Sequence, residues 1–353
     1  MDANNTNTTL SYSMFPGASF ADEDGVWFCH LQLPIMFYFD FSTNKVTVVK
    51  EVPMEFQGVQ GESFAADMVK INNKLYIAPY YSKSFFVYDI LSDTFESIMD
   101  VKTDKAFRTI IYSNDELILF PCKYEYLVRY NIKTRIISYD KLPFSETEFY
   151  IVAAKKSAES VFCAMFNSNS IWRYHLIDGK WDNISVEGTN GFNRLAVSND
   201  KLYLHEYAED RLICVKWGHN CSPIKYEGEL KNACAYRLDE DYMLINSETS
   251  GELAFCDAGF QEVRYIDFNY PYALAQGEDH ALCEIHCEDS FSKMNKIYCD
   301  HHILFHILDD GSIKWSYLQL DDISKKQLME AFSKRNIIKE NGLFSLEYFL
   351  ELV

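Results

Sequence analysis

Residues 85–98 read FFVYDILSDTFESI: an aromatic strand ends in Tyr-Asp, a polar turn follows, and a second short strand begins. Apolar residues on both sides of a turn that contains Asp and Ser predict a β-hairpin. Related phrases return along most of the chain. They are FYFDFSTNKVTVV, VRYNIKTRIISY, WRYHLIDGKWDNI, ICVKWGHNCSPI, LAFCDAGFQEV and LFHILDDGSIKWSYL. The chain is therefore expected to repeat one unit that contains this hairpin.

Two markers keep the same period. The first is the position of Asp89, which we call the anchor and which recurs every 41 to 49 residues. The anchors are Asp40, Asp89, Asn131, His175, Lys216, Asp257 and His306. The second marker is a phenylalanine about 20 to 26 residues before each of the first five anchors, at Phe20, Phe64, Phe107, Phe149 and Phe192.

A third element lies between the two markers, as in KLYIAPY at 74–80 and ELILFPC at 116–122. Each unit thus contains four short strands, the first of which begins at the phenylalanine. Four-stranded units at this period are the signature of a β-propeller. We expect an all-β fold with seven blades over residues 16–320, six blades being the alternative. Residues 1–15 are expected to be a flexible N-terminus or a strand that closes the ring.

The segments VYDILSDTF, YHLIDGKW and LDDGSIKW resemble the second half of the kelch repeat, which has a Tyr-Asp strand end, a polar turn and a Trp. The diglycine of that repeat is replaced by Ala78-Pro79, Phe120-Pro121 and His205-Glu206. The resemblance, to a degenerate kelch-like propeller of the galactose-oxidase and kelch superfamily, therefore implies the architecture and no particular function.

The pattern changes after Leu320, and residues 321–353 are expected to form a helical tail. Ser324 with Gln327 matches a capping box at the start of a first helix. Four apolar residues then share one face of a second helix at i, i+3, i+4 and i+7: Leu346, Phe349, Leu350 and Val353. The tail either packs back on the propeller or presents this face to a partner.

The composition argues against some classes of binding partner. The formal net charge of −19 and the absence of any run of Lys and Arg argue against a nucleic acid or an anionic membrane as the main partner. No stretch approaches the ~18 to 20 apolar residues of a membrane span, and no secretory signal is visible. The ten cysteines lie mostly within apolar strands, which favours reduced, buried thiols and a cytoplasmic location.

Two groups of residues are candidates for binding. The central funnel is expected to be lined by Glu62, Arg108, Tyr150, Asn193 and Arg194. These side chains suit an anionic sugar or an acidic peptide, since arginine binds carboxylates with two hydrogen bonds. Salt bridges between blades are the alternative role. The rim is expected to present Tyr80, Tyr81, Tyr124 and Tyr207, and tyrosine beside lysine is typical of protein interfaces.

The cluster of His and Cys in residues 280–306 supplies ligand types for zinc, but the strand geometry argues against a site. His302 and His306 would lie roughly 13 Å apart at ~3.3 Å per residue, too far for one metal with ~2 Å bonds. We expect no metal, and no cofactor motif is present. The leading hypothesis is a non-enzymatic scaffold that binds a protein or a glycan-like ligand. The alternative is an enzyme of epimerase or hydrolase type that acts on a sugar or acidic metabolite in the funnel; no catalytic residue is assigned.

Overall fold

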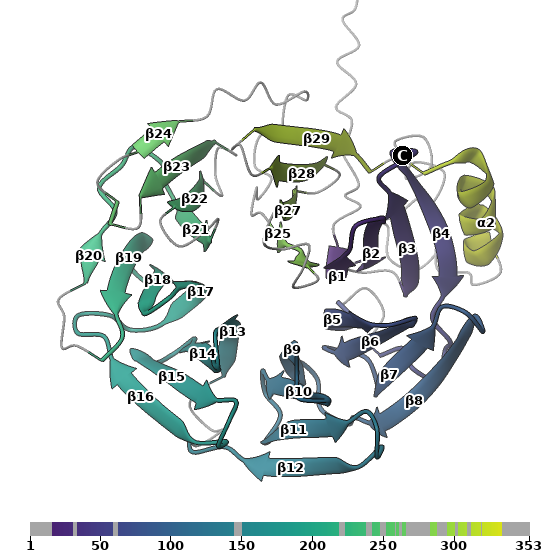
Figure 1. Ribbon diagram of the computed structural model, residues 1–353, viewed down its shortest axis with the longest axis horizontal. Helices are drawn as coiled ribbons and strands as arrows, with labels where there is room; N and C mark the ends of the chain where they lie inside the picture. The colour runs from purple at the N-terminus through teal and green to yellow at the C-terminus, as the bar shows by residue number, and fades with distance from the viewer. Residues whose placement is uncertain are drawn as a thin grey trace, which may run out of the picture.

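The computed structural model describes residues 16–30, 34–58, 63–144, 150–218, 223–237, 242–247, 252–257, 259–260, 263–265, 283–287, 295–300, 303–308, 312–318 and 320–333. These residues form seven antiparallel blades of four strands each, arranged in a ring (Figure 1). The prediction of a seven-bladed propeller is confirmed, and the six-bladed alternative is wrong. Each blade is built from one continuous stretch of chain, whose first strand is innermost and whose fourth is outermost.

The strands follow the chain in blade order. Blade 1 contains β1 (Pro16–Ala21), β2 (Gly25–His30), β3 (Ile35–Asp40) and β4 (Lys45–Glu51), and blade 2 contains β5 (Ala65–Ile71), β6 (Lys74–Pro79), β7 (Ser84–Asp89) and β8 (Thr94–Asp100). Blade 3 contains β9 (Phe107–Ser113), β10 (Glu116–Pro121), β11 (Tyr126–Asn131) and β12 (Ile137–Lys141), and blade 4 contains β13 (Ile151–Ser157), β14 (Ser160–Met165), β15 (Ser170–His175) and β16 (Trp181–Ser185). Blade 5 contains β17 (Phe192–Ser198), β18 (Lys201–Glu206), β19 (Arg211–Lys216) and β20 (Ile224–Lys225), and blade 6 contains β21 (Ala233–Arg237), β22 (Tyr242–Ser247), β23 (Leu253–Asp257) and β24 (Val263–Tyr265). Blade 7 contains β25 (Cys283–Glu284), β27 (Asn295–Asp300), β28 (Ile303–Leu308) and β29 (Ile313–Tyr317).

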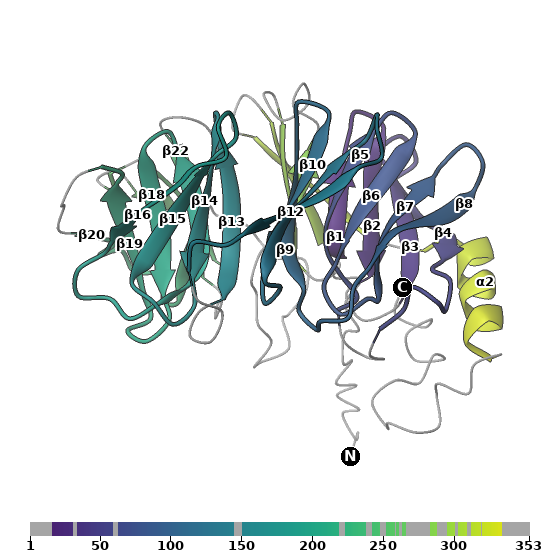
Figure 2. The ribbon, with the colours of Figure 1, turned by 90° about the horizontal axis from the view of Figure 1, so that it is seen from below.

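The up-and-down order of the strands gives the disc two different faces (Figure 2). The tight turns between first and second strands, and between third and fourth strands, lie on one face, which we call the hairpin face. The loops between second and third strands, and the connections between blades, lie on the other, which we call the connection face. The second face carries the longer and more varied segments.

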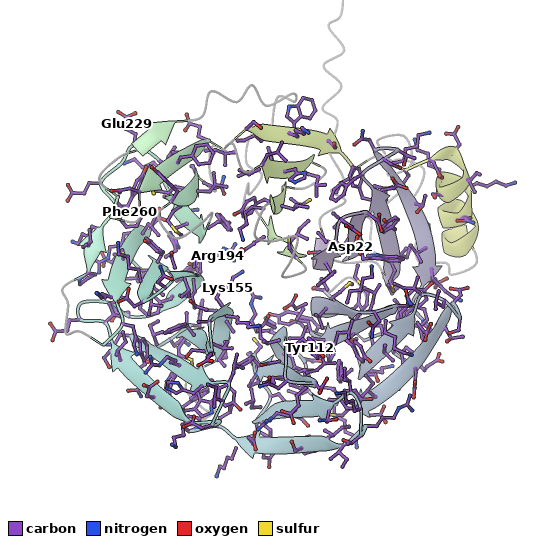
Figure 3. All side chains as sticks on the ribbon, viewed as in Figure 1. Asp22, Tyr112, Lys155, Arg194, Glu229 and Phe260 are labelled. Carbon is purple, nitrogen blue, oxygen red and sulfur yellow. The ribbon has the colours of Figure 1, made fainter. Side chains whose placement is uncertain are left out.

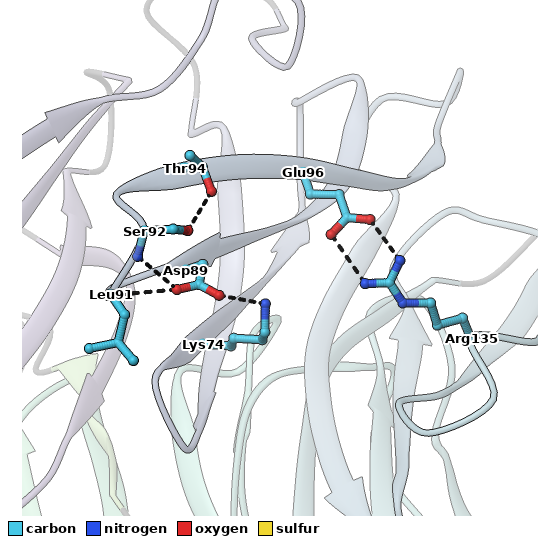
Figure 4. Close-up of polar contacts among 7 residues, drawn as sticks. All are labelled: Lys74, Asp89, Leu91, Ser92, Thr94, Glu96 and Arg135. Carbon is cyan, nitrogen blue, oxygen red and sulfur yellow. Dashed lines mark hydrogen bonds and ion pairs between the residues drawn. The ribbon is translucent and has the colours of Figure 1, made fainter.

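The anchor recurs because its side chain closes the turn on the hairpin face. The Asp89 Oδ1 atom accepts hydrogen bonds from the backbone N–H groups of Leu91 and Ser92, at 3.0 and 3.1 Å (Figure 4). Asp40 and Asn131 accept the equivalent pair of bonds in their own blades. Asp and Asn carry a short side-chain oxygen that suits this turn, which explains why these two residue types stand at most anchors.

The residue four positions after an anchor adopts a left-handed conformation and reaches back to the preceding blade. Asp93 (φ 52°) pairs with Lys50 of β4 at 2.7 Å. Arg135 (φ 60°) pairs with Glu96 of β8 at 3.2 Å, as Figure 4 shows. Asn44 (φ 54°) lies 3.2 Å from the Ser316 hydroxyl of β29, across the junction of blades 7 and 1. One turn position therefore links three successive pairs of blades.

The structure corrects two of the repeat assignments. Phe107 and Phe192 begin their innermost strands and Phe64 directly precedes one, as predicted, but Phe20 is the penultimate residue of β1. Phe20 therefore has the expected spacing from Phe64 but a different position in its strand. Phe149 lies outside the described residues. The seventh anchor is also misplaced, because His306 precedes the end of β28 by two residues.

The ring closes where the two ends of the propeller meet. The short strand β26 (His286–Cys287) pairs in parallel with β1, so Phe20 lies opposite His286. Leu320 then forms a bridge with Val46 of β4, and the helix α2 (Asp322–Ser333) lies along that outer strand (Figures 1 and 2). Residues 1–15, for which the alternative of a closing strand was left open, lie outside the described residues.

The predicted cap of this helix is wrong. The Asp321 carboxylate accepts the backbone N–H of Ser324 at 2.6 Å, so Asp321 is the capping residue. The Ser324 hydroxyl instead accepts the N–H of Val48 at 3.0 Å, which satisfies an outward-facing donor on β4. The start of the tail thus packs on the propeller. Leu346, Phe349, Leu350 and Val353 lie outside the described residues.

Candidate binding surface

The innermost strands of blades 1 to 5 each carry a register irregularity near the connection face. In β9 the irregularity falls at Arg108, because Phe107 and Thr109 pair with consecutive residues of β10. In β17 it falls at Asn193 in the same way. An extra residue in one strand re-aims its side chain. Two of the predicted funnel residues therefore occupy positions at which the regular strand pattern is broken.

The predicted funnel residues separate into two groups. Arg108 and Tyr150 are close enough for the guanidinium to affect the pKa of the phenol, although burial raises that pKa overall. Asn193 and Arg194 lie together in blade 5, and Arg194 lies near the ring axis in Figure 3. Glu62 lies outside the described residues. The four described residues therefore fall into two pairs, and the five-residue funnel site stays a prediction.

Arg108 and Tyr150 instead join two of the predicted rim tyrosines. The rings of Tyr80 and Tyr81 meet edge to face with centroids 5.2 Å apart. The Lys105 ammonium lies 5.9 Å from the centre of the Tyr81 ring. The Tyr81 side chain also raises the pKa of Lys105 by a hydrogen bond, which keeps this lysine charged. Residues of blade 2 and of the approach to blade 3 thus come together on the connection face.

Cys122 is buried next to this group, and the pKa of its thiol reflects the charges around it. Burial raises the pKa of its thiol, while Arg108, a hydrogen bond with Tyr80, and then Lys123 and Lys105 act in the opposite direction. The three cations are therefore within electrostatic reach of one buried sulfur atom. Because the thiol pKa stays raised, Cys122 is neutral at neutral pH and supplies no negative charge. We call Lys105, Arg108 and Lys123 the basic cluster.

The basic cluster has no carboxylate partner among the described residues. Every ion pair formed by those residues involves other cations, and no described carboxylate oxygen lies within 4.0 Å of these three side chains. Two lysines in turns of the hairpin face differ, as Lys133 pairs with Asp115 at 2.6 Å and Lys180 with Asp178 at 2.8 Å.

Backbone hydrogen bonds hold the basic cluster in place. The Ala106 N–H donates to the Tyr80 carbonyl at 3.0 Å, which joins blade 3 to the loop of blade 2. Within blade 3, the Cys122 N–H donates to the Ala106 carbonyl at 2.8 Å and the Lys123 N–H to the Lys105 carbonyl at 2.9 Å. The segments that carry the cations are thus tied to one another. A surface fixed in this way loses little conformational entropy when it binds.

Aromatic side chains extend from the basic cluster toward blade 5. The Tyr150 ring stacks on Phe166 at 4.9 Å, and Phe166 contacts Tyr207 at 5.6 Å. The Tyr207 side chain is 64% exposed. We call Tyr150, Phe166 and Tyr207 the aromatic row. Tyr124, also predicted at the rim, is half-buried like Tyr80 and Tyr81, and its ring contacts Phe107 at 5.1 Å.

Charged side chains near the ring axis are paired with one another. Lys155 of blade 4 reaches Glu284 of blade 7 at 2.5 Å, and Figure 3 shows Lys155 directed toward the axis. Lys70 of blade 2 pairs with Asp22, whose side chain is only 6% exposed. Salt bridges between blades therefore form here, between Lys155 and Glu284 and between Lys70 and Asp22.

Asn193 has an internal partner. Its Oδ1 atom lies 2.6 Å from Nδ1 of His205, whose Nε2 atom lies 3.0 Å from Asp210. His205 is buried, so this chain of contacts ties the irregular start of β17 to the turn before β19. We interpret it as structural support.

The described ranges contain neither a metal-ligand group nor a membrane-spanning helix. There, no group of three or more His, Cys, Asp or Glu is placed to hold a metal ion. No helix of that part is long and apolar enough to cross a membrane. Of the cluster considered for zinc, Cys299 is buried and the His306 ring stacks on Phe41, while His280, His301 and His302 lie outside the described residues.

The sequence predicted only some of the residues that form the basic cluster and its surroundings. Arg108, Tyr80, Tyr81 and Tyr150 were named in advance, but Lys105 and Cys122 were not. Lys105 lies two residues before the Phe107 marker, at a position where the other repeats have different residue types, so the repeat pattern gave no signal for it.

No protein-family model and no curated protein matches the chain. Solved structures with a similar fold include virginiamycin B lyase from Staphylococcus aureus in a catalytically inactive form with quinupristin, at 12% identity over 76% of this chain and 87% of that one, with a TM-score of 0.56. The β-propeller domain of Cps50 (Swd1) from Myceliophteria thermophila is similar at 9% identity over 89% and 100%, with a TM-score of 0.55. A chain of a mitotic checkpoint complex is similar at 8% identity over 90% and 97%, with a TM-score of 0.56. These likenesses show the seven-bladed β-propeller fold alone, and the kelch-type assignment stays a prediction.

Proposed function

We propose that this propeller is an interaction scaffold whose connection face, over blades 2 to 5, binds a protein partner. The observation that carries the proposal is the basic cluster, three cations without a described carboxylate partner that are fixed beside Tyr80, Tyr81 and the aromatic row. Tyrosine and arginine are enriched among the residues that contribute most to protein binding. A ring of blades displays such residues on one broad face without any need for chemistry.

Two features of the similar structures fit this proposal. One similar chain belongs to an assembly, the mitotic checkpoint complex. Two of the similar structures, including the Cps50 domain, cover nearly the whole propeller at below 10% identity. The fold is thus compatible with very different sequences. We keep the cytoplasmic location as part of the proposal, because six of the cysteines in strands are buried free thiols, as is usual in a reducing compartment.

A protein partner accounts for the surface better than the other candidates. A neutral glycan would leave the charges of the basic cluster without counterions. The enzyme alternative places its substrate near the axis, where Lys155 and Glu284 neutralise each other. A protein partner can contact both the cations and the adjoining tyrosines at once.

A face-specific photo-crosslinking experiment tests the proposal. The crosslinker p-benzoylphenylalanine replaces Tyr207 on the connection face or Ile177 on the hairpin face, which are 64% and 71% exposed. We expect a discrete adduct in lysate of the producing cells from position 207 alone, lost when Tyr81→Ala is added. Equal adducts from both positions would overturn the proposal. So would an adduct with twice the mass of the chain, which would assign the face to self-association.

A further inference from the structure

We propose that the basic cluster is an oxyanion-binding site that receives a carboxylate or phosphate from an acidic segment of the partner. This inference rests on the proposed function and names the chemistry of its occupant. Three cations held close together repel one another, and nearby negative charge is what would relieve that repulsion. No described carboxylate supplies this charge, and the ligand is its proposed source.

The donors of the site differ in a way that suits an oxyanion. Arg108 presents a planar fork that can bind two oxygens of one carboxylate or phosphate. Lys105 and Lys123 act as point charges near it, one from the connection that leads into blade 3 and one from the loop of the same blade. Lysine and arginine together can thus hold an anion and also orient it.

The neighbouring phenols add neutral donors. Burial raises the pKa values of Tyr80 and Tyr150, so both hydroxyl groups keep their protons at neutral pH. A protonated phenol can donate a hydrogen bond to an oxyanion without adding negative charge. Tyr150 is the candidate donor, since the Tyr80 hydroxyl bonds the Cys122 thiol. The neutral thiol of Cys122 beneath the cluster adds no repulsion either.

The surroundings of the site also indicate what lies beside the anion. Lys123 sits over the Tyr150 ring at 5.3 Å, and that ring begins the aromatic row toward the exposed Tyr207. An acidic segment bound at the cluster would therefore place its next residues on aromatic surface. We infer that the segment combines acidic residues with adjacent apolar or aromatic ones.

A defined polymer tests this inference on the full-length chain. The probe is a fluorescently labelled random copolymer of glutamate and tyrosine, with a copolymer of lysine and tyrosine as the opposite-charge control. The variant Lys105→Gln/Lys123→Gln removes two charges of the cluster. The matched control Lys133→Gln/Lys180→Gln removes two charges from the hairpin face, where each lysine is paired.

We expect the wild-type protein to bind the glutamate copolymer, with affinity that falls as salt is added. The cluster variant should bind it about tenfold or more weakly, because a hydrogen bond to a charged group contributes ~1.5–3 kcal/mol, while the hairpin-face variant should bind as the wild type does. Phosphorylating the tyrosines of the copolymer separates the two sources of the anion: binding of both forms assigns a carboxylate, and binding of the phosphorylated form alone assigns a phosphate.

Failure of both forms to bind, or equal losses in the two variants, would overturn the inference. Thermal melting of every variant confirms that it is folded. The scaffold proposal is judged separately, because photo-crosslinks at position 207 that survive Lys105→Gln/Lys123→Gln would leave the scaffold in place and remove the oxyanion site.

Discussion

The Lys123 ammonium of blade 3 lies 5.3 Å from the centre of the Tyr150 ring, which precedes blade 4. A cation over an aromatic face is attracted by the ring and keeps its charge available to other groups. Through this contact the basic cluster joins the aromatic row. The proposed binding surface is thus produced by the assembled ring and belongs to no single blade.

If the basic cluster serves binding, its charges should contribute little to folding. We expect Lys105→Gln/Lys123→Gln to change the free energy of unfolding by less than about 1 kcal/mol, toward greater stability, because repulsion is removed and surface charges contribute little. Chemical denaturation measures this. Lys70→Gln is the contrasting variant and should lose about 1–3 kcal/mol, since it leaves the buried Asp22 carboxylate without its cation. A larger loss in the cluster variant than in Lys70→Gln would contradict this account.

The anchor turns should weaken in acid. A hydrogen bond from Lys74, with further bonds from the backbone, lowers the pKa of Asp89 from 3.8 to about 2. A carboxyl group whose pKa is lower in the folded state stabilises the fold above its unfolded value, and this contribution is lost as the pH falls from about 4 to 2.

Asp89→Asn tests this anchor specifically. The variant keeps an oxygen for Leu91 and Ser92, as Asn131 does in blade 3, but cannot pair with Lys74. In urea unfolding, the stability lost on substitution should be constant above pH 4 and shrink toward pH 2. A loss that does not vary with pH would exclude the role of the charge.

Packing in blade 2 should depend on one aromatic side chain. Phe86 is fully buried and stacks on Phe56 at 5.3 Å. Phe86→Ala should cost about 3–5 kcal/mol, because it removes a large apolar group and leaves a cavity. Leu91→Ala, at a side chain that is 78% exposed, should change stability by less than about 0.5 kcal/mol. Equal effects in denaturation would show that the core is placed elsewhere.

The helix α2 should protect the outer edge of blade 1. Ser324→Ala leaves the Val48 N–H without its acceptor and should cost about 1–3 kcal/mol, as for other polar groups left unsatisfied. Hydrogen exchange at Val48 should accelerate at the same time. Lys326→Ala, on the exposed side of α2, is the control and should alter neither quantity.

The repeat was predictable because each anchor turn depends on residues close together in sequence. Asp89 needs only the backbone of Leu91 and Ser92 to close its turn, so one short stretch of sequence is enough to identify the repeat. The position of a marker residue along its strand was harder to predict. Phe20 has the spacing expected of the marker but lies near the end of β1 and not at its start. A match in spacing alone does not show where along a strand a residue lies.

The candidate surface was harder to predict because it forms between blades. Tyr80 and Ala106 come from different blades, and their hydrogen bond depends on how the ring closes. The capping residue was missed for a similar reason: the Ser324 hydroxyl is taken by Val48, 276 residues away in sequence, which leaves Asp321 to cap the helix. Local patterns predicted the units, and long-range contacts decided the site.

The most direct test of the central claim is hydrogen–deuterium exchange of the full-length protein with and without the glutamate–tyrosine copolymer. We predict slower exchange in peptides that contain residues 80–82, 105–108 and 122–124, and unchanged exchange in the anchor turns at 89–94 and 131–136. Protection confined to the anchor turns, or spread evenly over both faces, would contradict the assignment of the connection face as the binding surface.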